Sequence, residues 1–140
     1  MKHRFSPPAD RDVFLVDLDI RPEDIDVNGH VNNVVYVRWL QDAGTAHWMA
    51  RIGPEEQARW SWVAVRHEID YRHPLKLGDG AQARTWVGEA RGPRFDRFVL
   101  IERADGTVCA QGRTDWALVD AKTMKLARIG EEMVRPFLRP

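Results

Sequence analysis

One long stretch of this chain has the pattern of a helix, and it constrains the fold more than any other feature. No proline interrupts residues 31–53, Asn32 or Asn33 near its start is a good N-cap, and Gly53-Pro54 is a stop signal. Gly44 inside it costs roughly 1 kcal/mol against alanine, which close packing would explain. Apolar residues recur at spacings of three or four and form one stripe, Val35, Trp39, Ala43, Ala46 and Ala50.

Five other segments have strand patterns, one before this helix and four after it. Residues 12–20 alternate, with Asp17 and Asp19 on one face and apolar residues on the other, namely Phe14, Val16, Leu18 and Ile20. After the helix, strands are predicted over residues 60–71, 81–90, 94–103 and 107–120, joined by short turns. In the first of these, alternation places four residues on one face, Val63, Val65, Ile69 and Tyr71. A short closing helix is predicted near residues 130–138.

This order predicts an α+β fold in which a curved antiparallel sheet wraps around one long central helix. Such a sheet needs one face covered, and the long helix is the element able to cover it. The sequence contains no internal repeat or linker, so residues 1–140 are predicted to form one domain. The remaining surface and edges of such a sheet usually pair with a second copy, and a homodimer or homotetramer is expected.

Composition excludes several classes of partner. The 21 basic and 21 acidic residues balance, so no overall field attracts nucleic acid or a membrane surface. The N-terminus lacks the apolar stretch of a signal peptide, and no run approaches transmembrane length. The single cysteine, Cys109, excludes an internal disulfide and a cysteine-based zinc cluster, and it fits a small buried strand residue better than a nucleophile. A reducing cytoplasm is the expected compartment.

Turn-forming polar residues are concentrated in residues 24–33, immediately ahead of the helix. Helix N-termini expose unpaired N–H groups and carry partial positive charge, so the amides around Val31 to Asn33 are candidates for binding an oxyanion. The alternative is that Asn28 or Asn32 simply caps them. Asp26 likewise is either a carboxylate that faces a bound carbonyl or a turn residue that makes an Asx bond.

Three stretches carry a family resemblance: "DVNGHVNNVVYVRWLQD" (26–42), "IDYRHPLKLGD" (69–79) and "TDWALVDAKTMKLARIGEEM" (114–133). They resemble the hot-dog thioesterases of the 4-hydroxybenzoyl-CoA thioesterase superfamily, especially the branch close to the acyl-carrier-protein thioesterases of plants and bacteria. The resemblance implies the hot-dog fold and hydrolysis of an acyl thioester, normally of acyl-CoA or acyl-carrier protein, without a metal or cofactor. It does not define the acyl group.

The same resemblance implies roles for residues of the polar stretch. Asp26 matches the catalytic aspartate, which acts as nucleophile or as general base toward water. The position of Asn33 contributes a backbone amide to the substrate carbonyl. Asn28 would orient water or hold the carboxylate, and His30 would move a proton near neutral pH or donate to the carbonyl. Each of these last two can equally be a turn former.

Asp42 is a second candidate carboxylate. It follows Val35 by seven residues and Trp39 by three, which predicts a position beside the buried stripe instead of on the solvated face. A carboxylate there is costly unless it is paired or used as a base. The resemblance places the family's helical acid at this position. The alternative is an acid bonded to a neighbouring strand.

Arginine is dense between residues 84 and 103, and four arginines are candidates for binding the phosphates of CoA or of phosphopantetheine: Arg84, Arg91, Arg94 and Arg97. The alternative is solvated strand and turn charge. His47, His67 and His73 lack metal-ligand spacing and are interpreted as structural or surface residues. The tryptophans are expected in the core and a subunit interface, with one or two lining an acyl tunnel: Trp39, Trp48, Trp60, Trp62, Trp86 and Trp116.

Two other functions remain open from the sequence. Hot-dog enoyl-CoA hydratases or dehydratases resemble Asp-x-Asn-Pro-x-His, whereas here His30 follows Asp26 by four residues and Gly29 replaces the proline. The other is a non-catalytic domain that binds acyl thioesters and keeps the fold without turnover. The presence of Asp26, Asn28, His30 and Asp42 together argues against it. The bacterial short-chain acyl-CoA thioesterases often have histidine where this chain has Asn33, so their substrates do not transfer to it.

Overall fold

The elements follow the predicted order, with one strand before the long helix and four after it. The computed structural model describes residues 5–140, so residues 1–4 of the predicted domain lie outside the described residues. The elements are β1 (Phe14–Leu18), η2 (Pro22–Asp24), α1 (Asn33–Arg51), α2 (Pro54–Arg59), β2 (Trp60–Tyr71), β3 (Ala81–Arg91), β4 (Arg94–Arg103), β5 (Val108–Asp120), α3 (Glu131–Val134) and η3 (Arg135–Phe137). The sequence did not predict α2, because a helix of six residues is too short to show a detectable periodicity.

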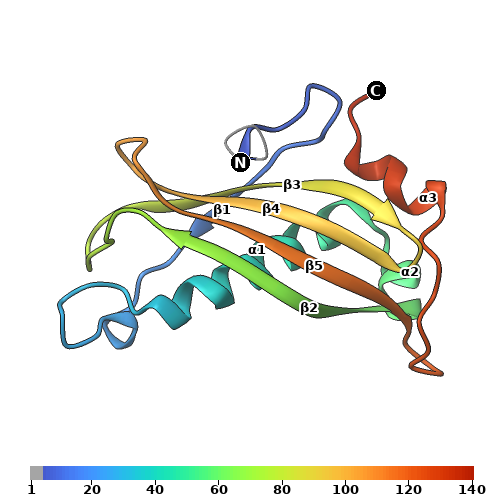
Figure 1. The fold of residues 1–140 in the computed structure, drawn as a ribbon, viewed down its shortest axis with the longest axis horizontal. Coiled ribbons are helices and arrows are strands. Elements are labelled where there is room, and N and C mark those ends of the chain that lie inside the picture. Colours follow the sequence, from blue (N-terminus) through green and yellow to red (C-terminus); the bar gives the residue numbers. More distant parts are fainter. Residues whose placement is uncertain (1–4) are drawn as a thin grey trace.

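The five strands form one antiparallel sheet in the order β1-β3-β4-β5-β2. Figure 1 shows this sheet curving over α1, and the helix contacts all five strands. The predicted α+β hot-dog architecture is therefore confirmed. The strand order leaves the 12 residues of β2 at one edge and the five residues of β1 at the other. No helix within residues 5–140 is long and apolar enough to cross a membrane.

The helix packs on the sheet through a face that is rotated from the predicted stripe. Asn32 is the N-cap, and its side chain accepts the Val34 N–H at 2.9 Å. The buried residues of α1 are Val35, Tyr36, Trp39, Leu40, Ala43, Gly44 and His47. Ala46 is only half-buried and Ala50 is exposed, so the prediction was wrong for the second half of the stripe. The cause lies in the sheet: a Cβ at Gly112 of β5 would lie 2.7 Å from Leu40 Cδ1. This glycine lets the Leu40 side of the helix approach the sheet closely.

A bulge in β2 changes which of its side chains face the helix. The pairing of β2 with β5 shifts register between Ala64 and Arg66. Trp62 pairs with Leu118 ahead of the bulge, while Val63 and Val65 are 43% and 47% exposed. The predicted common face of Val63, Val65, Ile69 and Tyr71 was therefore wrong, because one extra residue reverses the alternation.

A polar network is buried beneath the C-terminal half of α1. His47 is fully buried; its Nε2 lies 2.8 Å from Asp12 Oδ2, and its Nδ1 lies 2.8 Å from Arg97 Nη1. Arg97 also donates to Thr85 Oγ1 at 3.1 Å. Asp12 is held in turn by Arg51 Nε at 2.7 Å, and this contact is the main reason that the pKa of Asp12 is lowered.

These contacts fit the neutral form of His47. Because Arg97 can only donate, Nδ1 must accept, and Nε2–H then donates to Asp12. Protonating Nδ1 would place two donors against each other. Burial, followed by the charge of Arg97, lowers the pKa of His47 to about 4. Burial lowers the pKa of Arg97 to about 10, so this side chain remains a cation at neutral pH.

We expect stability to fall as the pH is lowered from 6.5 toward 4. In this window the unfolded chain protonates His47, whose ordinary pKa is 6.5, while the folded chain does not. Protons therefore favour unfolding, and the free energy of unfolding should decrease by up to about 3 kcal/mol. His67, whose pKa burial also lowers, adds a change of the same sign. Chemical denaturation at several pH values above 4.5 measures the slope.

The variant His47→Gln should lose most of this pH dependence, because an amide can bond Asp12 and Arg97 without titrating. His73→Gln, at an exposed position, is the matched control and should keep the parental slope. Equal slopes for all three proteins would contradict a neutral buried His47.

Candidate active site

The polar stretch ahead of α1 folds into a tight loop that Asp24 fixes to the helix. Asp24 is 3% exposed; its carboxylate accepts the Arg21 N–H at 2.9 Å and lies 3.3 Å from Nη2 of Arg38 on α1. Its backbone carbonyl accepts the Asn32 N–H at 2.8 Å. These bonds use the carboxylate of Asp24 for structure, so it holds the loop in place against the first turns of the helix.

Asp26 lies at the base of this loop with one carboxylate oxygen unused. Its N–H donates to the His30 carbonyl at 2.9 Å, and its own carbonyl accepts the Gly29 N–H at 3.0 Å. Gly29 has a φ of 79°, which glycine adopts without strain. Oδ1 accepts the Asn28 N–H at 2.9 Å, which is the Asx turn foreseen as an alternative. Oδ2 has no hydrogen-bond partner among residues 5–140, so the turn does not exhaust the carboxylate.

Of the backbone amides at the helix N-terminus that are candidates for binding an oxyanion, only one is without an acceptor in the described structure. The Val31 N–H donates to the Leu75 carbonyl at 2.8 Å, and the Asn32 N–H donates to Asp24. The Asn33 N–H has no acceptor within the described part of the chain. It begins α1, where the helix dipole adds to its positive charge. Of the predicted group, Asn33 alone therefore presents a free donor to a ligand.

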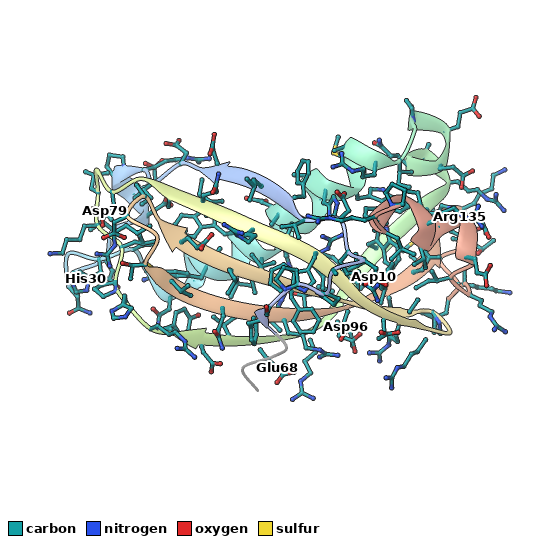
Figure 2. All side chains as sticks on the ribbon, turned by 90° about the horizontal axis from the view of Figure 1, so that it is seen from above. Asp10, His30, Glu68, Asp79, Asp96 and Arg135 are labelled. Carbon is teal, nitrogen blue, oxygen red and sulfur yellow. The ribbon has the colours of Figure 1, made fainter. Side chains whose placement is uncertain are left out.

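The side chains of Asn28 and His30 extend from the same loop. Asn28 is exposed and His30 is half-buried, and neither side chain has a hydrogen-bond partner among the residues described. Figure 2 shows His30 at one end of the molecule, the end where Asp79 also lies. The fold thus gathers four of the predicted site residues around the start of α1: Asp26, Asn28, His30 and Asn33.

Asp42 does not join this group. It lies about 14 Å further along the helix axis than Asn33 and is exposed, without an ion pair in the described structure. The predicted position beside the buried face was wrong for the single chain, because the helix turns its Tyr36 and Leu40 side toward the sheet.

Tyr71 is a residue near the site that the sequence analysis did not include. Its hydroxyl donates to the Asn33 carbonyl at 3.0 Å, and its ring packs edge-on against Tyr36 at 5.2 Å. Burial raises the pKa of Tyr71, so the hydroxyl keeps its proton at neutral pH. Its place in the second of the three resembling stretches was the one available signal, since strand alternation assigned it only to a face.

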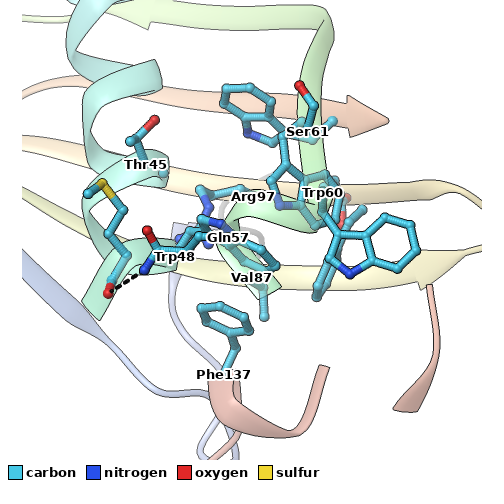
Figure 3. A pocket seen from close by; sticks show the side chains of 14 residues that line it. Thr45, Trp48, Gln57, Trp60, Ser61, Val87, Arg97 and Phe137 are labelled. Carbon is cyan, nitrogen blue, oxygen red and sulfur yellow. Dashed lines mark hydrogen bonds between the residues drawn. The ribbon is translucent and has the colours of Figure 1, made fainter. Parts of the chain in front are cut away.

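A cavity of about 320 Å³ lies at the opposite end of α1 (Figure 3). Aromatic side chains form most of its wall: Trp48, Trp60, Trp62, Phe95, Trp116 and Phe137. Trp48 is about 22 Å from Asn33 along the helix axis. In Figure 2, Arg135, from the closing segment that includes Phe137, lies at the end opposite His30. The cavity and the Asp26 loop of one chain are therefore well separated.

The four arginines predicted to bind substrate do not form one cluster: Arg84, Arg91, Arg94 and Arg97. Arg84 pairs with Glu102 at 3.2 Å, and Arg94 pairs with Asp115. Arg91 is exposed and has no acidic partner in residues 5–140. Arg97 faces α1 and is buried in the network described above. Only Arg91 keeps the properties expected of a surface phosphate ligand.

The three histidines interpreted as structural are dispersed. His47 is buried, His67 bonds Thr114 Oγ1 at 2.8 Å, and His73 is exposed. Across residues 5–140, no three His, Cys, Asp or Glu side chains are grouped so that they could hold a metal ion. Cys109 is buried, as its strand pattern predicts.

Solved structures share this fold over most of the chain. A thioesterase from Thermus thermophilus, solved with coenzyme A and Zn, is 25% identical with a TM-score of 0.78, and the match covers 93% of this chain and 94% of that one. The probable thioesterase YbaW from Escherichia coli is 22% identical with a TM-score of 0.74, covering 89% and 94%. A 1,4-dihydroxy-2-naphthoyl-CoA thioesterase from Synechocystis is 16% identical with a TM-score of 0.77, covering 90% and 96%.

Comparison of the sequence itself gives the family. No curated protein matches this sequence. The model of one family, described as the thioesterase-like superfamily, matches residues 20–137, a range that runs from before the Asp26 loop to the closing segment. The chain belongs to the thioesterase-like superfamily.

Proposed function

We propose that this protein hydrolyses an acyl thioester to a free acid and a thiol. The proposal is carried by one observation: the free Asn33 N–H begins α1 directly after the loop that holds Asp26 with its unpaired Oδ2. Attack on a thioester places negative charge on the carbonyl oxygen, and a preorganised amide at a helix N-terminus stabilises that charge. Membership of the thioesterase-like superfamily supports the same reaction.

Asp26 supplies the base or the nucleophile in this proposal. As a base it takes a proton from water while the water oxygen bonds to the carbonyl carbon; the C–S bond then breaks, and the leaving thiolate takes up a proton. As a nucleophile it bonds to the carbonyl carbon and expels the thiolate, and water hydrolyses the resulting anhydride. Asn28 orients the water or the carboxylate. His30 donates to the carbonyl or carries the proton. Asp42 lies outside this set.

The acyl group requires an apolar site, and we propose the aromatic cavity of a second copy. The cavity of the same chain is too far from Asn33, whereas β2 links the two regions along the sheet edge. Trp60 and Trp62 at the start of β2 line the cavity, and Tyr71 at its end touches Asn33. If two copies pair antiparallel along β2 about a two-fold axis, the start of one strand lies opposite the end of the other.

The β2 edge has the properties of such an interface. It is the longer free edge of the sheet, and an unpaired edge presents backbone donors and acceptors to another strand. Val63 and Val65 expose apolar surface along it. This pairing would form a homodimer, alone or as half of a homotetramer, and place the cavity of each copy beside the Asp26 loop of the other.

CoA is the proposed thiol carrier. The Thermus thermophilus thioesterase with which this chain shares 25% identity was solved with coenzyme A, which supports an acyl-CoA substrate. Arg91 would contact its phosphates, and Arg84 and Arg94 would contribute less because carboxylates already hold them. An acyl-carrier protein presents the same phosphopantetheine arm and is the alternative carrier.

We expect Asp26→Asn to abolish most turnover while the protein stays folded. The asparagine oxygen can still accept the Asn28 N–H, so the turn is preserved and only the charge is lost. Thiol release from short, long and aromatic acyl-CoAs should fall by at least about 10²–10⁴-fold in kcat, the usual contribution of a general base. Asp26→Ala should lose activity and some thermal stability, because it also removes the turn acceptor.

Asp105→Asn is the matched control, since Oδ1 of Asp105 accepts the Thr107 N–H at 3.0 Å in a similar turn. It should keep parental turnover. Parental activity in Asp26→Asn would overturn the catalytic assignment, and a folded parent that binds acyl-CoA without turnover would indicate a binding domain.

Two inactive variants should restore activity when mixed, if each site is shared between copies. Asp26→Asn removes the charge from one half of the site. Thr45 lines the cavity, so Thr45→Trp fills part of the cavity with a large side chain. Co-refolding them in equal amounts should give roughly a quarter of parental activity, because half of the dimers are mixed and one of their two sites is intact. No recovery, or a parent that is monomeric by light scattering, would contradict the shared site.

A further inference from the structure

Arg97 is a buried cation with unused donors. It is 7% exposed, and the two Nη1 hydrogens are used by His47 Nδ1 and Thr85 Oγ1. Nε and Nη2 have no acceptor among residues 5–140, and the side chain lines the aromatic cavity (Figure 3). Asp96 lines the same cavity, but its carboxylate is bonded by Arg113 Nε at 3.0 Å and forms no ion pair with Arg97.

The network around Arg97 has an excess of positive charge. Asp12 supplies one negative charge, and it lies between Arg51 at 2.7 Å and neutral His47 at 2.8 Å. Arg51 and Arg97 supply two positive charges. Buried charges are normally paired, because an uncompensated charge in a protein interior is costly. A ligand with one negative charge would balance this group.

A second unused donor belongs to a side chain that lines the same cavity. The indole Nε1 of Trp116 is buried and has no hydrogen-bond acceptor within the described range. Trp116 and Arg97 are neighbours at Gly44, where a Cβ would lie 3.2 Å from Arg97 Cδ and 3.4 Å from Trp116 Cζ2. The glycine therefore makes room for both side chains beside α1. Two neighbouring side chains that line one cavity and carry unpaired donors indicate a ligand with acceptor oxygens.

We infer that Arg97, assisted by Trp116, binds a carboxylate at the far end of the acyl group, so that the preferred substrates are monothioesters of dicarboxylic acids. The Nε and Nη2 donors of arginine form a planar fork that matches both oxygens of a carboxylate. The aromatic walls and the volume of about 320 Å³ suit an aromatic or short aliphatic body between carboxylate and thioester. A neutral ligand with acceptor oxygens would satisfy the donors of Arg97 and Trp116, but it would not balance the excess positive charge of the network. This inference rests on the proposed thioester hydrolysis.

Matched substrate pairs test the inference. The pairs are 4-carboxybenzoyl-CoA with 4-methylbenzoyl-CoA, and adipoyl-CoA with heptanoyl-CoA. We expect the parent to prefer the carboxylate member of at least one pair by about tenfold or more in kcat/KM, since a site with unpaired buried donors rejects substrates that cannot bond them. Arg97→Met should lower kcat/KM for the carboxylate member and thereby lose this preference.

Two further variants keep the result interpretable. Trp116→Phe keeps an aromatic ring but removes the indole N–H donor, so it should reduce the preference even if Arg97→Met does not fold. Arg128→Met removes an exposed positive charge outside the cavity and should leave the preference unchanged. No preference in the parent, or an equal preference in folded Arg97→Met and in Trp116→Phe, would overturn the inference.

A binding measurement separates this inference from the proposed function. Terephthalate and 4-methylbenzoate are titrated while tryptophan fluorescence is recorded, because tryptophans line the cavity. Terephthalate should bind the parent and Asp26→Asn alike and bind Arg97→Met at least about tenfold more weakly. Such binding without any acyl-CoA turnover would reject the proposed hydrolysis while retaining the carboxylate site. Turnover without a carboxylate preference and without this binding would reject the site alone.

Discussion

The close approach of α1 to the concave face of the sheet is the contact on which the rest of this structure depends. Two glycines permit it, one on each side: Gly112 of β5 admits Leu40, and Gly44 of α1 admits Arg97 and Trp116. A side chain at either position would meet these groups at 2.7–3.4 Å. The axis of α1 then fixes the positions of both functional regions, because the Asp26 loop precedes its first turn and the cavity surrounds its second half.

The two ends of α1 differ in their chemistry. At the N-terminus, backbone groups and the dipole supply positive charge, and the loop leaves Asn33 N–H and Asp26 Oδ2 free. At the other end, aromatic walls surround the buried guanidinium of Arg97. The first suits a reacting carbonyl and the second an acyl group with a charged terminus. Along the helix axis, the cavity residues Gly44 and Trp48 lie about 16 and 22 Å from Asn33. This separation gives the long β2 edge its proposed importance, because pairing with a second copy would bring the two chemistries together.

Part of the candidate site was predictable because it is local. Asp26, Asn28, His30 and Asn33 lie within a few residues of one helix start, so their neighbourhood follows from the chain itself. Which amide remains free was not predictable, because Val31 bonds a carbonyl from the distant residue Leu75. The environments of the arginines depend on pairing between strands, which places Arg84 diagonally across from Glu102 and turns Arg97 toward the helix.

The sequence by itself determined the order of the long helix and the five strands, a helix cap at Asn32 or Asn33, and the wrapping of one sheet around one helix. These follow from periodicity, capping and the need to cover an apolar face. Only the tertiary structure decided which helix face is buried, because the glycines of α1 and β5 set that contact. It also decided the reversal of β2 at its bulge, where the pairing with β5 shifts register, and the exposure of Asp42. The buried His47–Arg97 network joins residues from the start of the chain, α1, β3 and β4, and no local pattern could bring these together.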